Sequence, residues 1–286
     1  MLRSVRSTLL PAFDAAFENH AAVHQRFRFH AVHARNLVTD DALLLRAFDR
    51  LGRRERSVAT VVLAGAALIR TADDARWVTA GEGFALADKL SLAVRCEAAP
   101  TYRAVVFEWS ADLAVGPVAA PLAAVALPAG ALAEVERLWQ ALREPWTPAA
   151  IAPRLVEHLT ALRAAGVPLA PVDRSSLAEP VPPRLAEVSE ALDAQLSDLA
   201  AQPMSVDLEA RLGLSSRQLS RLVRELNQRY GFNADGWLDV RNRRRVMVAT
   251  ALLSDRRRPV TEVARVVGYT SAQVMARALA DAGLPA

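Results

Sequence analysis

The sequence lacks the features that build disulfides, cysteine-rich metal centres and membrane spans. Cys96 is the only cysteine among the 286 residues, which excludes an internal disulfide and a cysteine-rich metal site and fits a reducing cytoplasm. Charged residues and His20 interrupt the apolar residues near the N-terminus, so the sequence predicts neither a signal peptide nor a transmembrane helix. We therefore expect a cytoplasmic protein that is long enough for two domains.

Lysine is nearly absent, since Lys89 is the only one and the other thirty-four basic residues are arginines. The charges are unevenly distributed along the chain. Residues 1–181 hold twenty bases and nineteen acids, whereas residues 211–277 hold fourteen arginines and five acids. A nearly neutral front half followed by a basic stretch is the charge pattern expected of a DNA-binding domain.

The basic stretch contains one local design twice, at about residues 206–228 and 260–282. Each copy has a short amphipathic segment, then Gly213 or Gly268, then a second amphipathic segment. The glycine can take the positive φ that ends a helix, and a hydroxyl side chain after it can cap the next helix. The candidate caps are Ser215, Ser216, Thr270 and Ser271. Such a unit is a helix-turn-helix, whose second helix enters the DNA major groove.

The second segment of the first copy has a polar, cationic face. The residues at i, i+3, i+4 and i+7 are Arg217, Ser220, Arg221 and Arg224, opposite an apolar face. Arginine can form two hydrogen bonds with guanine, and Gln218 or Gln273 can do the same with adenine. An isolated arginine stripe is more often a solvated helix face, but its place in a repeated motif favours DNA recognition.

The order of motifs resembles the C-terminal part of the AraC/XylS family of bacterial transcription regulators, over about residues 184–286. The resemblance is carried by the repeated unit, by Gly231 and Trp237, by the stretch RVMVATALL at residues 245–253, and by Pro259-Val260 five residues later. It implies two helix-turn-helix units joined by a long helix. The DNA-facing positions that it implies are Ser216, Arg217, Gln218, Ser220 and Arg221, then Thr270, Ser271, Ala272, Gln273 and Arg277.

Several residues depart from the family pattern. Glu209 stands where the family has a small alanine, and Met275 and Leu279 stand where it has aromatic residues. The last helix has Arg277 as its only base, and about three extra residues follow Trp237. We therefore expect the second unit to contribute less to DNA reading than the first. Arginine triplets flank the connecting helix, and the phosphate contacts that we expect come from Arg243, Arg244, Arg256 and Arg257.

The front half has the alternating pattern of strands. Between residues 60 and 112 one face carries Val105, Phe107 and Trp109, and turn signals at Asp73-Asp74, Gly81–Gly83 and Pro100 separate the runs. Within residues 1–57 the pattern indicates one short strand, around Phe27 and Phe29. We predict a small antiparallel β-barrel or sandwich at about residues 58–112. In the family that the chain resembles, a cupin-like, effector-binding barrel often holds this position.

Histidine is missing where a metal-dependent cupin enzyme would need it, since residues 59–157 contain none. His20 and His24 have the i, i+4 spacing of a helical metal pair, but no Glu or Cys completes a set and neighbouring arginines would repel a cation. No Ser–His–Asp or Cys–His arrangement is suggested. The sequence therefore predicts no metal, no cofactor and no catalytic residue.

Residues 131–165 switch to helical spacing, and Pro145 and Pro148 separate two apolar stripes. The stripes are Leu132, Val135, Leu138, Trp139 and Leu142, then Ile151, Leu155, Leu159 and Leu162. This helical hairpin either packs on its own domain or forms a homodimer seam, as comparable helices often do in the resembled family. Residues 168–183 are rich in proline and predict a linker.

The sequence thus predicts an α+β protein with two domains. Residues 1–167 form an effector-binding or oligomerisation domain, and residues 184–286 form an all-α domain that binds double-stranded DNA. The predicted function is transcription regulation modulated by a small-molecule effector, with RNA polymerase as a further partner if the regulator is an activator. Two alternatives stay open: a cupin-type binder or enzyme with a degenerate DNA module, and a regulator controlled by a protein partner.

Overall fold

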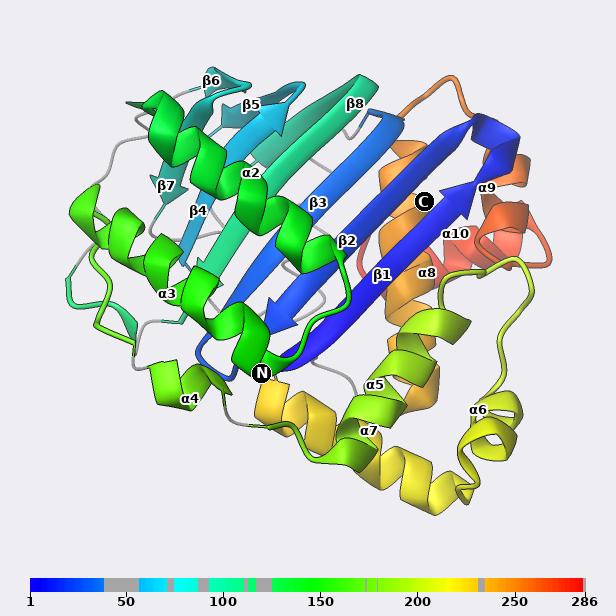
Figure 1. The fold of residues 1–286 in the computed structure, drawn as a ribbon. Helices are drawn as coiled ribbons and strands as arrows, with labels where there is room; N and C mark the ends of the chain where they lie inside the picture. Colours follow the sequence, from blue (N-terminus) through cyan, green and yellow to red (C-terminus); the bar gives the residue numbers. More distant parts are fainter. Residues whose placement is uncertain are drawn as a thin grey trace.

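The computed structural model describes residues 1–38, 57–70, 75–86, 93–110, 113–116, 125–172, 174–178, 180–230 and 235–284. An antiparallel sheet forms the N-terminal part and helices form the C-terminal part (Figure 1), so the α+β class is confirmed. The expected turn at Asp73-Asp74 and the position of Gly231 lie outside the described residues. No helix in the described ranges combines the length and apolar character that crossing a membrane requires.

Nine described strands form one antiparallel sheet. They are β1 (Leu2–Leu10), β2 (Ala15–Val23), β3 (Phe27–Val38), β4 (Ser57–Ala64), β5 (Ala66–Arg70), β6 (Ala75–Thr79), β7 (Glu82–Leu86), β8 (Ala93–Trp109) and β9 (Val125–Ala126). Their order is β1-β2-β3-β8-β4-β7-β9, with β5 paired to both β6 and β8, and the 3-10 turn η1 (Pro11–Phe13) joins β1 to β2. Residues 1–38 therefore supply three long strands, whereas their sequence indicated a single short one.

The helices lie on both sides of the sheet. Figure 1 shows α2 (Ala129–Arg143) and α3 (Pro148–Ala164) in front of it and the C-terminal helices beside and behind the β1 edge. The remaining helices are α4 (Arg174–Ala178), α5 (Pro183–Gln195), α6 (Ser205–Leu212), α7 (Ser216–Tyr230), α8 (Trp237–Leu253), α9 (Val260–Val266) and α10 (Ala272–Asp281). One apolar cluster fills the space between the sheet and the α2–α3 hairpin, and a second joins the other sheet face to the C-terminal helices.

The alternation in β8 matches these two clusters. Val105, Phe107 and Trp109 are buried with the α2–α3 hairpin, as their shared face predicted, whereas Tyr102 and Ala104 belong to the cluster on the other face. Pro100 does not make the predicted turn, because β8 continues through it. It lies between the stretch of β8 that pairs with β5 and the stretch that pairs with β4, and opposite a register shift in β3. A proline is tolerated there because no ladder hydrogen bond needs its missing N–H.

The apolar stripes of α2 and α3 pack on the chain's own sheet. Val135, Leu138, Leu142 and Leu155 are buried there, and the Trp139 indole donates to the Val32 carbonyl at 3.1 Å. Burial of these stripes releases roughly 1.5–3 kcal/mol per large apolar side chain. A homodimer through residues 131–165 would therefore have to use the outward, polar faces of the two helices.

The proline-rich segment after α3 is packed on the sheet domain. Leu169 forms an isolated bridge with Ala114, and Leu177 of the short helix α4 is fully buried in the cluster beneath the hairpin. The helix predicted to open the C-terminal domain begins only at Pro183, as α5. Within the described residues, then, much of the expected linker has fixed contacts rather than free solvent around it.

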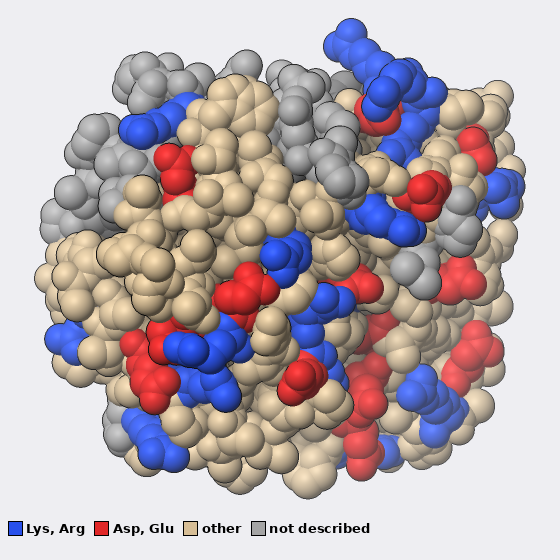
Figure 2. All heavy atoms as spheres, turned by 45° about the horizontal axis from the view of Figure 1, so that its top comes forward, with Lys and Arg blue, Asp and Glu red and all other residues tan. Residues whose placement is uncertain are grey.

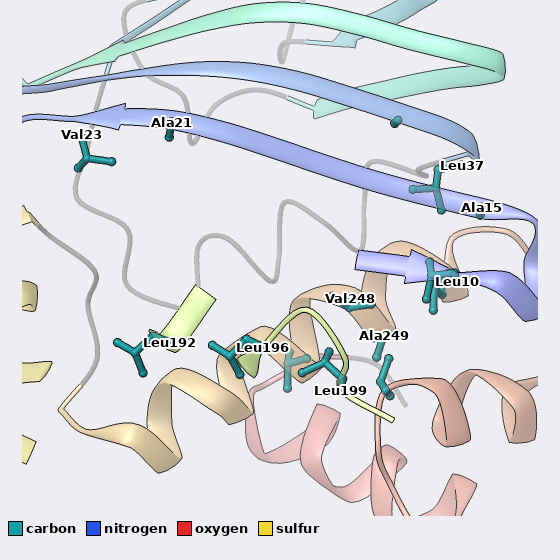
Figure 3. Close-up of a cluster of buried hydrophobic side chains, with 14 of the residues drawn as sticks. Leu10, Ala15, Ala21, Val23, Leu37, Leu192, Leu196, Leu199, Val248 and Ala249 are labelled. Atoms are coloured by element: carbon teal, nitrogen blue, oxygen red, sulfur yellow. The ribbon is translucent and has the colours of Figure 1, made fainter. Parts of the chain in front are cut away.

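An apolar interface joins the sheet to the C-terminal helices. Figure 3 shows side chains from the strands, such as Leu10 and Leu37, and side chains from the helices, such as Leu192 and Val248, on the two sides of this interface. The labelled strand residues come from β1, β2 and β3, all within the first 38 residues. Residues with no clear role in the sequence pattern thus form the docking face for the C-terminal part.

Polar contacts at the β1 edge reinforce the interface. An edge strand leaves alternate N–H groups unpaired in the sheet, and the Val5 N–H donates to the Asp193 carboxylate of α5 at 2.8 Å. The Ser4 hydroxyl donates to the same oxygen at 2.7 Å, and Arg6 lies 3.6 Å from the other. Burial raises the pKa of Asp193, and these neighbours counteract the rise. The carboxylate therefore depends on its partners from β1.

Replacing Asp193 with alanine should lower the free energy of unfolding by about 3 kcal/mol, because Ser4, Val5 and Arg6 lose their shared buried acceptor. Glu190→Ala is the matched control, since Glu190 is exposed on the same helix and should change stability by less than about 0.5 kcal/mol. Urea denaturation of the full chain measures both losses. Equal losses would show that the Asp193 contacts do not stabilise the interface.

Candidate DNA-binding surface

The first helix-turn-helix unit consists of α6 and α7, and its turn is built by local hydrogen bonds. Gly213 ends α6 in the left-handed region, at φ 61°. The Ser215 hydroxyl accepts from the Gln218 N–H at 3.3 Å, and the Ser215 N–H donates to the Gln218 side-chain oxygen at 2.9 Å. This reciprocal pair is a capping box, so Ser215 rather than Ser216 caps α7. With its oxygen occupied, Gln218 keeps only its amide NH₂ for a base edge.

Helix α7 divides into a buried and an exposed face, as its spacing predicted. Its buried residues are Leu219, Leu222, Val223, Leu226 and Tyr230. Ser216, Arg217, Gln218, Arg221 and Arg224 are exposed, and Ser220 is half-buried. Arg217 and Arg221 form no ion pair with another described residue, whereas Arg224 donates back to the Ser220 carbonyl at 3.3 Å. The N-terminal half of α7 thus presents two unpaired guanidinium groups to solvent.

The second unit consists of α9 and α10. Gly268 stands in the turn at φ 79°, and the Ser271 hydroxyl caps α10 by accepting from the Val274 N–H at 3.2 Å. Met275 and Leu279 are buried and fill the positions where the resembled family has aromatic residues. Thr270, Gln273 and Arg277 are exposed, and Ser271 and Ala272 are half-buried. The exposed face of α10 therefore offers one cation, whereas Arg217, Arg221 and Arg224 give the corresponding face of α7 three.

Glu209 does not distort the first unit. It is half-buried on α6, and its carbonyl accepts from the Leu214 N–H at 3.0 Å across the turn. The corresponding Ala264 of α9 is buried, so the two units pack differently at this position. Because Glu209 is only half-buried, its carboxylate can reach solvent, and the first unit accommodates this departure from the family pattern.

Two of the four arginines expected to contact phosphate are committed elsewhere. Arg244 donates to the Thr8 hydroxyl of β1 at 2.7 Å, and burial lowers its pKa to about 10; the expectation that it faces phosphate is therefore wrong. Arg243 forms an ion pair with Asp239 at 2.8 Å. The arginine triplet in the sequence could not predict which of its members contacts another part of the protein, because consecutive helical residues point in different directions.

The second triplet is also divided between solvent and the domain interface. Arg256 and Arg257 are exposed, and Arg257 forms a two-point ion pair with Asp255. Arg258 instead donates to the Asn36 carbonyl of β3 at 2.8 Å and lies over the Phe13 ring, 4.6 Å from its centre. The Arg257 side chain stays 82% exposed despite this pair, whereas that of Arg243 is 31% exposed, so Arg256 and Arg257 keep positions from which a phosphate can be reached.

The charge is mixed on the face around α2, α3 and the upper edge of the sheet. In Figure 2, basic and acidic side chains are interspersed across this face. Ion pairs between α2 and the sheet include Arg143 with Glu18 at 2.6 Å and Arg103 with Glu136 at 2.7 Å. Because the charges are paired locally, this face has little net positive potential to attract a polyanion such as DNA.

The N-terminal histidines do not form a metal centre among the described residues. His20 lies on strand β2, so its spacing from His24 is not that of a helical pair. Burial and Arg143 lower the pKa of His20, and His24 stacks on Phe27.

No family model matches the chain, and no curated protein matches it in sequence. Solved structures share only a distant likeness. ToxT from Vibrio cholerae is 8% identical with a TM-score of 0.32, over 88% of this chain and 93% of that one. The AraC-like transcriptional activator CuxR is 11% identical with a TM-score of 0.35, over 76% of this chain and 77% of that one. Ectoine synthase from P. lautus is 11% identical with a TM-score of 0.24, over 32% and 63%. These TM-scores are too low to assign a family or a function to the chain.

Proposed function

We propose that the chain is a sequence-specific DNA-binding transcription regulator in which α7 is the principal recognition helix. The observation that carries this proposal is the exposed pair Arg217 and Arg221 near the start of α7. In a helix-turn-helix, the first residues of the second helix are the ones that reach base edges. Arginine is the side chain that contacts guanine most often.

The second unit has a supporting role in this proposal. Its α10 offers Gln273 and Arg277, and α8 is continuous from Trp237 to Leu253, so the extra residues after Trp237 lie inside the helix. Three extra helical residues rotate everything after them by roughly 300°. The second unit, which follows α8, is therefore rotated relative to the first. The exposed Arg256 and Arg257 are the phosphate-contacting residues that we retain.

The front domain modulates this activity through its docking on the C-terminal helices. Its contacts with α5 and α8 run through Asp193 and Arg244, so a change at the sheet can alter how the DNA-binding helices are held. We place the regulator in the cytoplasm, with double-stranded DNA as its partner. RNA polymerase is a further partner if the regulator is an activator.

Binding to DNA should weaken steeply as salt increases, because cationic side chains displace counterions from phosphates. If about six to eight phosphates are neutralised, log K should fall with log salt at a slope of roughly −5 to −7. Filter binding of the full chain to a DNA duplex at several salt concentrations measures the slope. A slope near zero would contradict the proposed function.

A further inference from the structure

A cavity of about 380 Å³ lies between the sheet and the helical hairpin. Strands β4 and β7 form its floor, with Thr60 and Phe84 among the lining residues. Helices α2 and α3 form its roof, with Val135 and Leu138 on the first and His158 on the second. Pockets of this size, with mainly apolar walls and a few placed polar groups, are typical of small-molecule sites.

His158 is a buried polar residue that lines this cavity. It is 8% exposed, and one edge of its ring packs on Phe29 with the ring centres 5.6 Å apart. Its ring nitrogens form no hydrogen bond with another described residue. These nitrogens are therefore available to form a hydrogen bond with a ligand that enters the cavity. Burial lowers the pKa of His158 to about 4, and the ring is therefore neutral near pH 7.

We propose that this cavity binds a small, mainly hydrocarbon molecule that carries one hydrogen-bonding group for His158. A neutral imidazole can accept from a hydroxyl or an N–H, or donate to a carbonyl. The charged lining residues Glu134, Arg154 and Glu157 are exposed and border solvent. A ligand that buries its own charge beside His158 would meet no opposite charge, and so the site selects uncharged, weakly polar compounds.

The position of the cavity connects it to the rest of the chain. Gly166, Val167 and Pro168 line one end, and the chain continues from them into the segment that carries α4 and α5. Helix α5 in turn holds Asp193 against β1. A ligand that pushes on Pro168 therefore acts on the covalent connection between the two domains. This step rests on the proposed function, since it makes the bound molecule an effector of DNA binding, whereas the site itself does not depend on it.

N-phenyl-1-naphthylamine is a suitable probe, because it is uncharged, mainly hydrocarbon and has a single N–H, and its fluorescence rises when it leaves water. The full chain should bind it with one site per molecule. Filling the cavity from both helices with Ala131→Trp and Ala161→Trp together should weaken binding by at least about tenfold, since both residues line the cavity. The matched control is Ala133→Trp with Ala164→Trp, because these exposed alanines lie on the same helices outside the lining.

The hydrogen bond is tested separately with His158→Phe and two probes. Affinity for N-phenyl-1-naphthylamine should fall about two- to tenfold. Affinity for 1-benzylnaphthalene, a hydrocarbon of similar shape without the N–H, should not fall. Equal binding by the cavity-filling and control variants would overturn the site, and equal effects of His158→Phe on both probes would overturn the role of His158. No DNA is present, so either failure leaves the DNA-binding proposal standing.

Discussion

Replacing Gly268 with alanine should lower the free energy of unfolding by at least about 3 kcal/mol. A Cβ atom at this position would lie 2.1 Å from the Leu199 carbonyl oxygen and 2.8 Å from an Arg245 nitrogen. The residue also has φ +79°, a left-handed conformation that costs an L-residue roughly 1–2 kcal/mol. The carbonyl belongs to the backbone and cannot rotate away as a flexible side chain would. The turn of the second unit must therefore shift or open.

Gly213→Ala is the matched control, because it stands in the equivalent turn of the first unit. Its φ is +61°, and a Cβ there would meet nothing within 4 Å. Only the conformational cost of roughly 1–2 kcal/mol applies. Urea denaturation of both variants measures the difference. Equal losses would mean that the close approach of Gly268 to Leu199 is relieved without cost.

Alanine substitution of both Arg217 and Arg221 should weaken binding to the specific DNA site by about 2–6 kcal/mol, since each arginine–guanine contact is worth about 1–3 kcal/mol. Both side chains are exposed and unpaired with other described residues, so the folded chain should keep its stability. Arg229→Ala is the control on the same helix, because Arg229 pairs with Glu225 near the far end of α7. Competitive binding to specific and random duplexes measures the change.

The same measurement ranks the two helix-turn-helix units. Gln273→Ala and Arg277→Ala should each cost at least about 1 kcal/mol less than Arg217→Ala. Arg257→Ala should weaken binding to all sequences alike, because a phosphate contact carries no base information. If Arg217→Ala weakened specific and random DNA equally, α7 would not be the reading helix.

The helices α6, α7, α9 and α10 could be predicted because their signals are local. Glycine, a capping serine and helical spacing all lie within about twenty residues, and the structure has each helix near its expected bounds. The same holds for Val105, Phe107 and Trp109, whose alternation set their shared buried face. Sequence alone made Gly213 and Gly268 look equivalent. Their difference comes from Leu199 and Arg245, which packing brings to only one of them.

The domain interface could not be predicted, because its contacts join residues far apart in the sequence. Arg244 contacts Thr8, and Arg258 contacts Asn36, yet both arginines sit in triplets that read equally well as phosphate contacts. Nothing in the sequence indicated that His158 lines a cavity, since a lone histidine in a helical stripe is ordinarily a core residue. Only the cavity beside it and the lack of a described hydrogen-bond partner set it apart.

Sequence-specific DNA binding by α7 is tested most directly by selecting duplexes from a random pool with the full chain and with Arg217→Ala, and sequencing both sets. We expect the wild-type chain to enrich one motif containing guanine, and the variant to lose its preference at a single position while keeping it elsewhere. No enriched motif, or the same motif from both proteins, would show that Arg217 of α7 does not read the DNA sequence.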